Sequence, residues 1–121
     1  MFAPPGVWNP ASNPPSQQFV ALLDTGASLT CISPKVAQAL GVKPIGMIPV
    51  SSASHPNLPT NTYLIDIGVL FGSWGILWQS NVQVLEFQPV AGSAYEMLLG
   101  RDIICQGALT VSFDGHWTFS I

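Results

Sequence analysis

The feature that most constrains this chain is an apolar run, Phe19–Leu23, that leads into the Asp-Thr-Gly sequence of residues 24–26. Five consecutive apolar residues predict a buried strand, so this strand delivers a carboxylate to the edge of a core. Burying a carboxylate is costly, because desolvation disfavours its charged form. A solvated turn in which Asp24 caps a backbone amide is the alternative. We favour a functional carboxylate, because the small residues Ala27 and Ser28 leave room for a substrate backbone to approach.

The composition favours a small all-β domain. Of 121 residues, 48% are hydrophobic and only 7% are charged, well below the usual quarter. Eleven glycines and eleven prolines favour short strands and turns over long helices. The length fits one domain. A chain with so many apolar residues and so few charges implies that a partner covers part of its surface.

The charged and metal-binding residue types exclude several function classes. Three basic residues, Lys35, Lys43 and Arg101, cannot form a patch that tracks a phosphate backbone, so no nucleic acid is expected. The two cysteines and two histidines lack metal-ligand spacing, so no metal or cofactor is expected. Cys31 and Cys105 are flanked by apolar residues and are interpreted as free buried thiols, with a disulfide as the open alternative.

The N-terminal residues 1–17 hold five prolines and are predicted to form an extended arm, with the domain at 18–121. The arm could instead be the remnant of a larger precursor. Residues 1–18 lack the pattern of a signal peptide, and the longest apolar stretch, Val69–Trp78, is too short to cross a membrane. The localisation is unknown, with a cytoplasmic protein as the default.

The remaining pattern predicts short strands and one clear helix over Ser33–Gly41, with Ser33 as N-cap, Pro34 at the first position and Gly41 as the stop. A polar, turn-rich segment at 51–61 lies between strand-like sequences and predicts a long hairpin. The expected strands are Phe19–Leu23, Leu29–Ile32, Val42–Val50, Thr62–Ile67, Val69–Trp78, Asn81–Phe87, Ala108–Phe113 and His116–Ile121, the last two joined by a two-residue Asp114-Gly115 turn. With a second short helix at Asp102–Gln106, these elements predict a small closed, mostly antiparallel β-barrel.

A second motif, Leu98–Asp102, follows the first by about 75 residues and again brings an apolar strand to a glycine. Together the two motifs resemble the retropepsin-like aspartic proteases, which include the retroviral proteases and the protease-like domains of DNA-damage-inducible ubiquitin-shuttle proteins. The resemblance covers about residues 18–106 and rests on Phe19–Ser28, a flap around residues 48–67, and Leu98–Asp102.

This resemblance implies a single-lobe acid-protease barrel and assigns roles to matching residues. The implied catalytic residues are Asp24, Thr25 and Gly26, the implied substrate-binding residues are Ala27, Ser28, Ala53, Ser54 and His55, and the implied structural support is Leu99, Gly100 and Arg101. Retroviral enzymes usually carry an acidic residue where Ser28 stands, and it pairs with the helix arginine. Ser28 cannot form that ion pair. The terminal hairpin also extends beyond the short retroviral pattern and implies a different dimer interface, as in the ubiquitin-shuttle type.

Three further groups of residues are given structural rather than functional interpretations. His55, beside Pro56 at the tip of the expected flap, is interpreted from its position alone as an exposed loop residue. Asp102 is interpreted as a helix-start acid at the positive end of the helix dipole. The tryptophans Trp74, Trp78 and Trp117 are interpreted as core or interface residues.

The Asp-Thr-Gly motif occurs once, whereas the chemistry of this family needs two carboxylates that share one proton. The sequence therefore predicts a homodimeric aspartic endopeptidase that acts on extended peptides, with one Asp24 from each protomer on a two-fold axis. The leading alternative is a catalytically weak protease-like domain that serves for dimerisation or peptide binding. The third hypothesis is a plain β-barrel interaction domain in which Asp24 is an ordinary turn residue.

Overall fold

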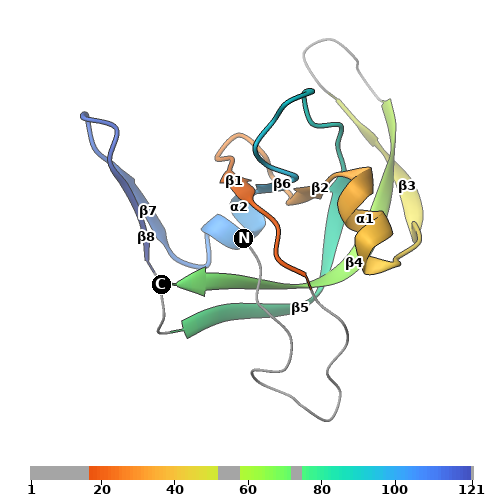
Figure 1. The fold of residues 1–121 in the computed structure, drawn as a ribbon, viewed down its shortest axis with the longest axis horizontal. Helices are drawn as coiled ribbons and strands as arrows, with labels where there is room; N and C mark the ends of the chain where they lie inside the picture. Colours follow the sequence, from red (N-terminus) through yellow and green to blue (C-terminus); the bar gives the residue numbers. More distant parts are fainter. Residues whose placement is uncertain (1–16, 52–57, 72–74, 121) are drawn as a thin grey trace.

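The computed structural model describes residues 17–51, 58–71 and 75–120, and the described chain is mostly β. Two short helices accompany the strands (Figure 1). The elements are β1 (Ala21–Leu23), β2 (Cys31–Ile32), α1 (Pro34–Leu40), β3 (Gly46–Val50), β4 (Leu58–Phe71), β5 (Gly75–Glu86), β6 (Met97–Leu99), α2 (Arg101–Ile104), β7 (Ala108–Val111) and β8 (Trp117–Ser120).

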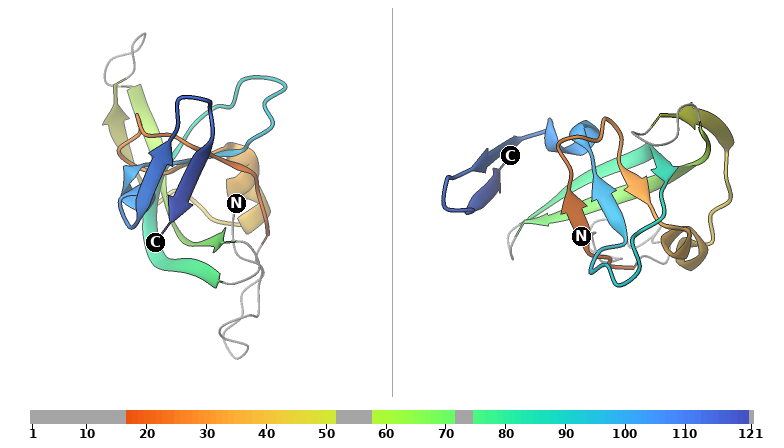
Figure 2. Two further views of the ribbon diagram at one scale, coloured as in Figure 1. Left: turned by 90° about the vertical axis from the view of Figure 1, so that its left-hand side faces the viewer. Right: turned by 90° about the horizontal axis from the view of Figure 1, so that it is seen from above.

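Six of the strands form one curled sheet in the order β1-β6-β2-β5-β4-β3, while β7 and β8 pair separately. The six-stranded sheet bends into a half-barrel (Figures 1 and 2). The expectation of a mostly β fold with short helices is confirmed. A closed barrel is not seen in the described residues, where β1 and β3 are the two edge strands.

The sheet is mixed rather than antiparallel throughout. β1 runs parallel to β6 and β2 runs parallel to β5, whereas β2–β6, β3–β4 and β4–β5 are antiparallel. Parallel neighbours require a long connection, and the chain between β1 and β6 supplies one that contains β2 to β5. This connection allows β6 to lie between β1 and β2 and to reach the turn that joins them.

The core lies on one face of the long strand β4. Tyr63, Ile65, Ile67 and Val69 are buried on that face, while Leu64 between them is exposed. This alternation follows from the two-residue period of a strand. Residues from other elements complete the cluster: Ile32, Val36, Ala37, Val84, Met97, Leu99 and Ile103.

Helix α1 forms as its sequence predicts. The Ser33 hydroxyl accepts a hydrogen bond from the Val36 amide at 3.2 Å, and Pro34 occupies the first turn. Gly41 ends the helix in the left-handed region at φ 69°. The helix packs Val36 and Ala37 into the core, so local capping and burial favour the same boundaries.

Several predicted strand boundaries are wrong. Val69–Trp78 is not one strand, because β4 ends at Phe71 and β5 begins at Gly75, and these two residues face each other in an antiparallel pair. Leu58–Asn61, expected within the turn-rich segment, belong to β4. The sequence interpretation gave the apolar residues on both sides more weight than Gly72, Ser73 and Gly75, which are residue types typical of a turn between two strands.

Four other elements begin or end a few residues away from their predicted bounds. β1 starts at Ala21 rather than Phe19, β2 is limited to Cys31–Ile32, β3 starts at Gly46, and α2 begins and ends earlier than predicted. The predicted strand Asn81–Phe87 is instead the second half of β5, where Asn81 has φ 56° beside a register irregularity between Ile65 and Ile67.

The β7–β8 hairpin is present, but its loop has three residues rather than two. The Ser112 amide donates to the His116 carbonyl at 2.7 Å, and the Gly115 amide donates to the Ser112 carbonyl at 3.0 Å. Gly115 has φ 88°, whereas Asp114 does not have a positive φ. A two-residue type I′ turn needs positive φ at both positions, so Asp-Gly here forms a type I turn followed by a left-handed glycine.

Candidate functional site

Strand β1 ends in a tight turn, residues 24–27, which we call the Asp24 turn. The Asp24 side chain accepts a hydrogen bond from the Gly26 amide at 2.9 Å, and its carbonyl accepts one from the Ala27 amide at 3.2 Å. These bonds fix the carboxylate against its own backbone, as Asp commonly does in turns. Asp24 is half-buried, while Thr25 and Gly26 are exposed beside it.

The second motif lies directly against this turn. β6 pairs in parallel with β1, with Leu23 opposite Leu99, and the Asp24 amide donates to the Leu99 carbonyl at 2.9 Å. The Arg101 amide then donates to the Ala27 carbonyl at 2.8 Å. The two motifs, far apart in sequence, are thus hydrogen-bonded at both ends of the Asp24 turn.

Gly100 makes this approach possible. A Cβ atom at this position would lie 2.6 Å from the Leu29 carbonyl carbon and 2.9 Å from the Ala27 carbonyl oxygen. Backbone atoms cannot move aside as a flexible side chain can, so only glycine fits at position 100 against the backbone of Ala27 and Leu29.

Arg101 contacts the Asp24 turn without an acidic partner. Its guanidinium donates to the Thr25 carbonyl at 2.9 Å. Ser28 is exposed, and within residues 17–51, 58–71 and 75–120 Arg101 forms no ion pair with a carboxylate. A charge-assisted hydrogen bond to the backbone therefore stands where the retroviral pattern has an ion pair.

A buried network that the sequence interpretation missed joins the two motifs. Thr30 is fully buried, and its amide and hydroxyl donate to the two carboxylate oxygens of Asp102 at 3.0 and 2.8 Å. The Thr30 hydroxyl in turn accepts from the Gly100 amide at 3.1 Å. Asp102 lies in the first turn of α2 as predicted, but its main partner is 72 residues away. No local pattern signals such a contact.

The predicted substrate-binding residues divide into two groups. Ala27 and Ser28 lie on or next to the Asp24 turn, half-buried and exposed respectively. Ala53, Ser54 and His55 lie outside the described residues. The described arms of their hairpin, β3 and β4, pair antiparallel up to Val50 and Leu58.

Both cysteines are free, but their surroundings differ from the prediction of two buried thiols. Cys31 is half-buried in β2, whereas Cys105 at the end of α2 is exposed. Burial, reinforced by the negative charges of Asp24 and Asp102, raises the pKa of the Cys31 thiol from 9.0 to about 11. Cys31 is therefore a neutral neighbour of the Asp24 carboxylate at physiological pH.

This raised pKa predicts slow alkylation of Cys31. The thiolate is the reactive form, and below pH 9 its fraction is about 100-fold lower than for a thiol of ordinary pKa. We expect iodoacetamide at pH 8 to label Cys105 first, as read by peptide mass spectrometry. A Cys105→Ser variant in urea supplies the control, because unfolding restores the reactivity of Cys31. Equal labelling of both thiols in the folded chain would contradict the assignment.

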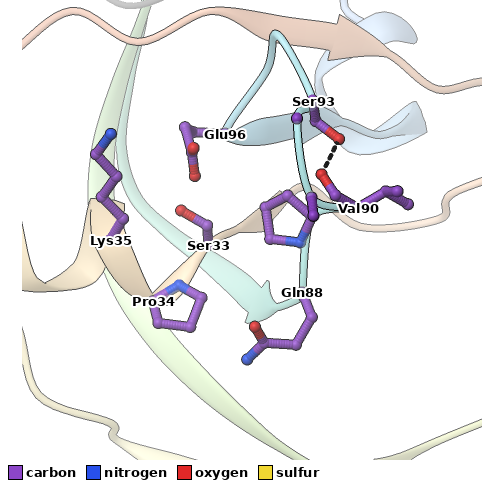
Figure 3. Close-up of a pocket in the computed structure, with 10 residues that line it drawn as sticks. Ser33, Pro34, Lys35, Gln88, Val90, Ser93 and Glu96 are labelled. Carbon is purple, nitrogen blue, oxygen red and sulfur yellow. Dashed lines mark hydrogen bonds between the residues drawn. The ribbon is translucent and has the colours of Figure 1, made fainter.

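Pockets formed by the described residues include one beside β1 and one beside α1. One, of about 370 Å³, is lined by residues 21–23, Thr25 and the hairpin residues Leu109, Val111 and Trp117. Trp117, predicted to be core or interface, is 62% exposed and is not core in this chain; Trp74 lies outside the described residues and Trp78 is half-buried. The other pocket, of about 320 Å³, lies between the start of α1 and the loop before β6 (Figure 3). No predicted site residue lines this second pocket.

No three His, Cys, Asp or Glu side chains within residues 17–51, 58–71 and 75–120 gather closely enough to hold a metal ion. No helix in these ranges is long and apolar enough to span a membrane.

Comparison with known proteins agrees with the geometry of the Asp24 turn. The family model described as aspartyl protease matches residues 15–103, which include both motifs and the strands between them. No curated protein and no solved structure matched the chain. Because the matched region covers well over half of the sequence, this chain belongs to the aspartyl protease family.

Proposed function

We propose that this chain is a retropepsin-like aspartic endopeptidase that is active as a homodimer. The observation that carries the proposal is the Asp24 turn, whose carboxylate is oriented by Gly26 and whose backbone is bonded to Leu99 and Arg101 of the second motif. An orienting network of this kind holds a reactive group at fixed geometry before substrate arrives.

The other carboxylates in the chain support the need for a second protomer. Asp102 accepts from Thr30 with both oxygens, Glu86 accepts from the Tyr63 hydroxyl, and Asp66 accepts from the Asn81 amide. Asp114 is bonded to His116 at the tip of the β7–β8 hairpin, and Glu96 precedes β6 at the end opposite Leu99. None of these groups offers Asp24 a partner, so the second carboxylate comes from another copy.

In the proposed mechanism the two Asp24 carboxylates share one proton, because two like charges about 3 Å apart do not both ionise. The ionised carboxylate takes a proton from a bound water as the water oxygen attacks the scissile carbonyl carbon. The protonated carboxyl donates its proton to the carbonyl oxygen, which gives a tetrahedral diol. The carboxyl that took the water proton gives it to the nitrogen as the C–N bond breaks, and the ionised carboxylate takes a proton from a diol hydroxyl. A carboxylic acid and an amine leave, and the pair again holds one proton.

The neighbouring residues take supporting roles in this proposal. Thr25 locks the two turns across the axis, and Gly26, Ala27 and Ser28 bind the substrate backbone. The hairpin of β3 and β4 closes over an extended peptide as a flap and excludes water. Ala53, Ser54 and His55, which lie outside the described residues, are proposed to bind the peptide. Leu99, Gly100 and Arg101 hold the turn in place. We further infer that the protease domain spans residues 18–121 and that residues 1–17 form an arm outside it.

The test is cleavage of a peptide library between pH 4 and 9, with and without pepstatin. We expect cleavage that pepstatin blocks and that declines towards neutral and alkaline pH, because the pair must retain one proton. A rate that rises above neutrality, or that pepstatin leaves unchanged, would contradict a carboxylate pair. Peptide binding without cleavage would instead support the catalytically weak alternative.

A further inference from the structure

The pocket of about 320 Å³ beside α1 is separate from the Asp24 turn, because no residue of that turn or of the Leu98–Asp102 motif lines it. One wall is the start of α1, with Ser33 and Lys35, and the other is the loop that leads into β6, with Glu96 at its end (Figure 3). The volume lies at the lower end of the range for small-molecule sites, about 300–1,000 Å³, so the pocket suits a small ligand.

The loop wall is ordered by its own contacts. The Ser93 amide donates to the Val90 carbonyl at 2.9 Å, and Gly92 has φ 83°, as the third residue of a type II turn requires. At the base of the loop, the rings of Phe87 and Tyr95 stack with centroids 6.4 Å apart and planes 11° from parallel. A wall that is ordered in advance loses little entropy on binding, which favours the binding of a small ligand.

The pocket presents one cationic and one anionic side chain. Lys35 is exposed on the helix wall and Glu96 is half-buried on the loop wall, and neither forms an ion pair with another side chain in the described part of the protein. The backbone of Glu96 is fixed, since its amide donates to the Val20 carbonyl and its carbonyl accepts from the Ser33 amide, both at 3.0 Å. A ligand with one charge is attracted by one of these side chains and repelled by the other, whereas a ligand with both charges is attracted by both.

A buried hydroxyl adds a hydrogen-bond donor to the helix wall. Ser33 is 1% exposed, and its oxygen accepts a hydrogen bond from the Val36 amide at 3.2 Å. A hydroxyl also has one hydrogen to donate, and among the described residues no acceptor for it is found. Buried donors are almost always hydrogen-bonded, so this O–H requires an acceptor in the pocket that Ser33 lines. A carboxylate bound by Lys35 supplies that acceptor.

We propose that this pocket binds a small zwitterion with a free α-ammonium and a free α-carboxylate, namely an amino acid or a dipeptide. Glu96 pairs with the ammonium, while Lys35 and the Ser33 hydroxyl bind the carboxylate. Pro34 and Pro89 also line the pocket and suit a small apolar side chain on the ligand. This inference goes beyond the proposed peptide cleavage and does not depend on it.

The first experiment measures binding of alanyl-alanine to the full chain at neutral pH by NMR titration, followed through the amide signals of Gly92 and Ser93. N-acetylation or C-amidation of the dipeptide removes one charge, and each should raise the dissociation constant about 10-fold, as loss of a hydrogen bond between charged groups does. L-Alanine is titrated in parallel, and the tighter of the two ligands identifies whether the pocket takes an amino acid or a dipeptide. Equal binding of the free and blocked forms would overturn the proposal.

The second experiment assigns each ligand charge to its protein partner. Glu96→Gln should weaken binding of alanyl-alanine about 10-fold and abolish the further cost of N-acetylation, and Lys35→Gln should do the same for C-amidation. Asp66→Asn and Lys43→Gln are the matched controls, because both residues are charged, exposed and outside the pocket, and they should leave binding unchanged. A cost of N-acetylation that persists in full in Glu96→Gln would overturn the proposal.

The Asp24→Asn chain separates this pocket from the proposed active site. It should bind alanyl-alanine as tightly as the unsubstituted chain, since Asp24 does not line the pocket. Loss of dipeptide binding in this variant would place the ligand at the Asp24 turn and overturn the pocket proposal, while the protease function would stand. Retained cleavage with normal dipeptide binding would overturn the protease function and support the pocket.

Discussion

Replacing Asp24 with asparagine should lower peptide cleavage by at least about 10³-fold, because an amide can neither accept the proton of the attacking water nor share one with its partner. The fold should survive this change. The Gly26 amide donates to an Asp24 side-chain oxygen at 2.9 Å, and an asparagine oxygen can accept the same hydrogen bond. Initial rates on a cleaved peptide measure the effect, and sedimentation checks that the proposed dimer persists.

Asp66→Asn is the matched control for this substitution. Asp66 is also a carboxylate that accepts a hydrogen bond from a backbone amide, that of Asn81 at 2.9 Å, but its exposed side chain belongs to β4, which three strands separate from β1 in the sheet. Its replacement should leave the cleavage rate unchanged. An Asp24→Asn chain that retains full activity would remove the basis of the proposed function.

Replacing Asp102 with alanine should lower the free energy of unfolding by about 2–4 kcal/mol. The substitution removes both acceptors of Thr30, which is fully buried, and leaves its amide without a partner. Because Thr30 also accepts from the Gly100 amide, the Asp24 turn should lose its fixed position and cleavage should fall with stability. Urea denaturation at one fixed protomer concentration measures the effect, since the stability of the proposed dimer would depend on protein concentration.

A double-mutant cycle with Thr30→Val distinguishes the network from a general loss of packing. If Asp102 acts through Thr30, the double variant should be much less destabilised than the sum of the two single variants. Asp102→Asn should be intermediate, because one amide oxygen can replace only part of the paired acceptors. Additive costs would mean that the two residues stabilise the fold independently.

Prediction from the sequence was accurate where neighbouring residues decide the structure. The caps of α1 are an example, because Ser33, Pro34 and Gly41 act within one or two turns of their own helix. It was less accurate along β4 and β5, where Gly72, Ser73 and Gly75 interrupt the apolar stretch but were not taken as the signal that separates two strands. The Asp114-Gly115 loop was assigned to the right place with the wrong turn type, because Asp114 does not adopt the positive φ that a two-residue turn requires.

The candidate site shows the same contrast between features that local sequence predicts and features that depend on distant contacts. The Asp24 turn and the Leu99–Arg101 segment were recognisable as motifs, because their residue types and order carry the signal. The Thr30–Asp102 network and the raised pKa of Cys31 were not, since both depend on groups brought together across the sheet.

The sequence by itself therefore determined the family, the strand-rich character of the chain and the single carboxylate of the Asp24 turn. Only the tertiary structure decided that β6 lies parallel to β1, that Asp102 bonds to Thr30, and that the β7–β8 hairpin stands apart with its apolar face exposed. The physical reason is the separation along the sequence of the residues that interact. Caps and turns are fixed by residues a few positions apart, whereas strand order and buried polar contacts depend on which distant segments the folded core places side by side.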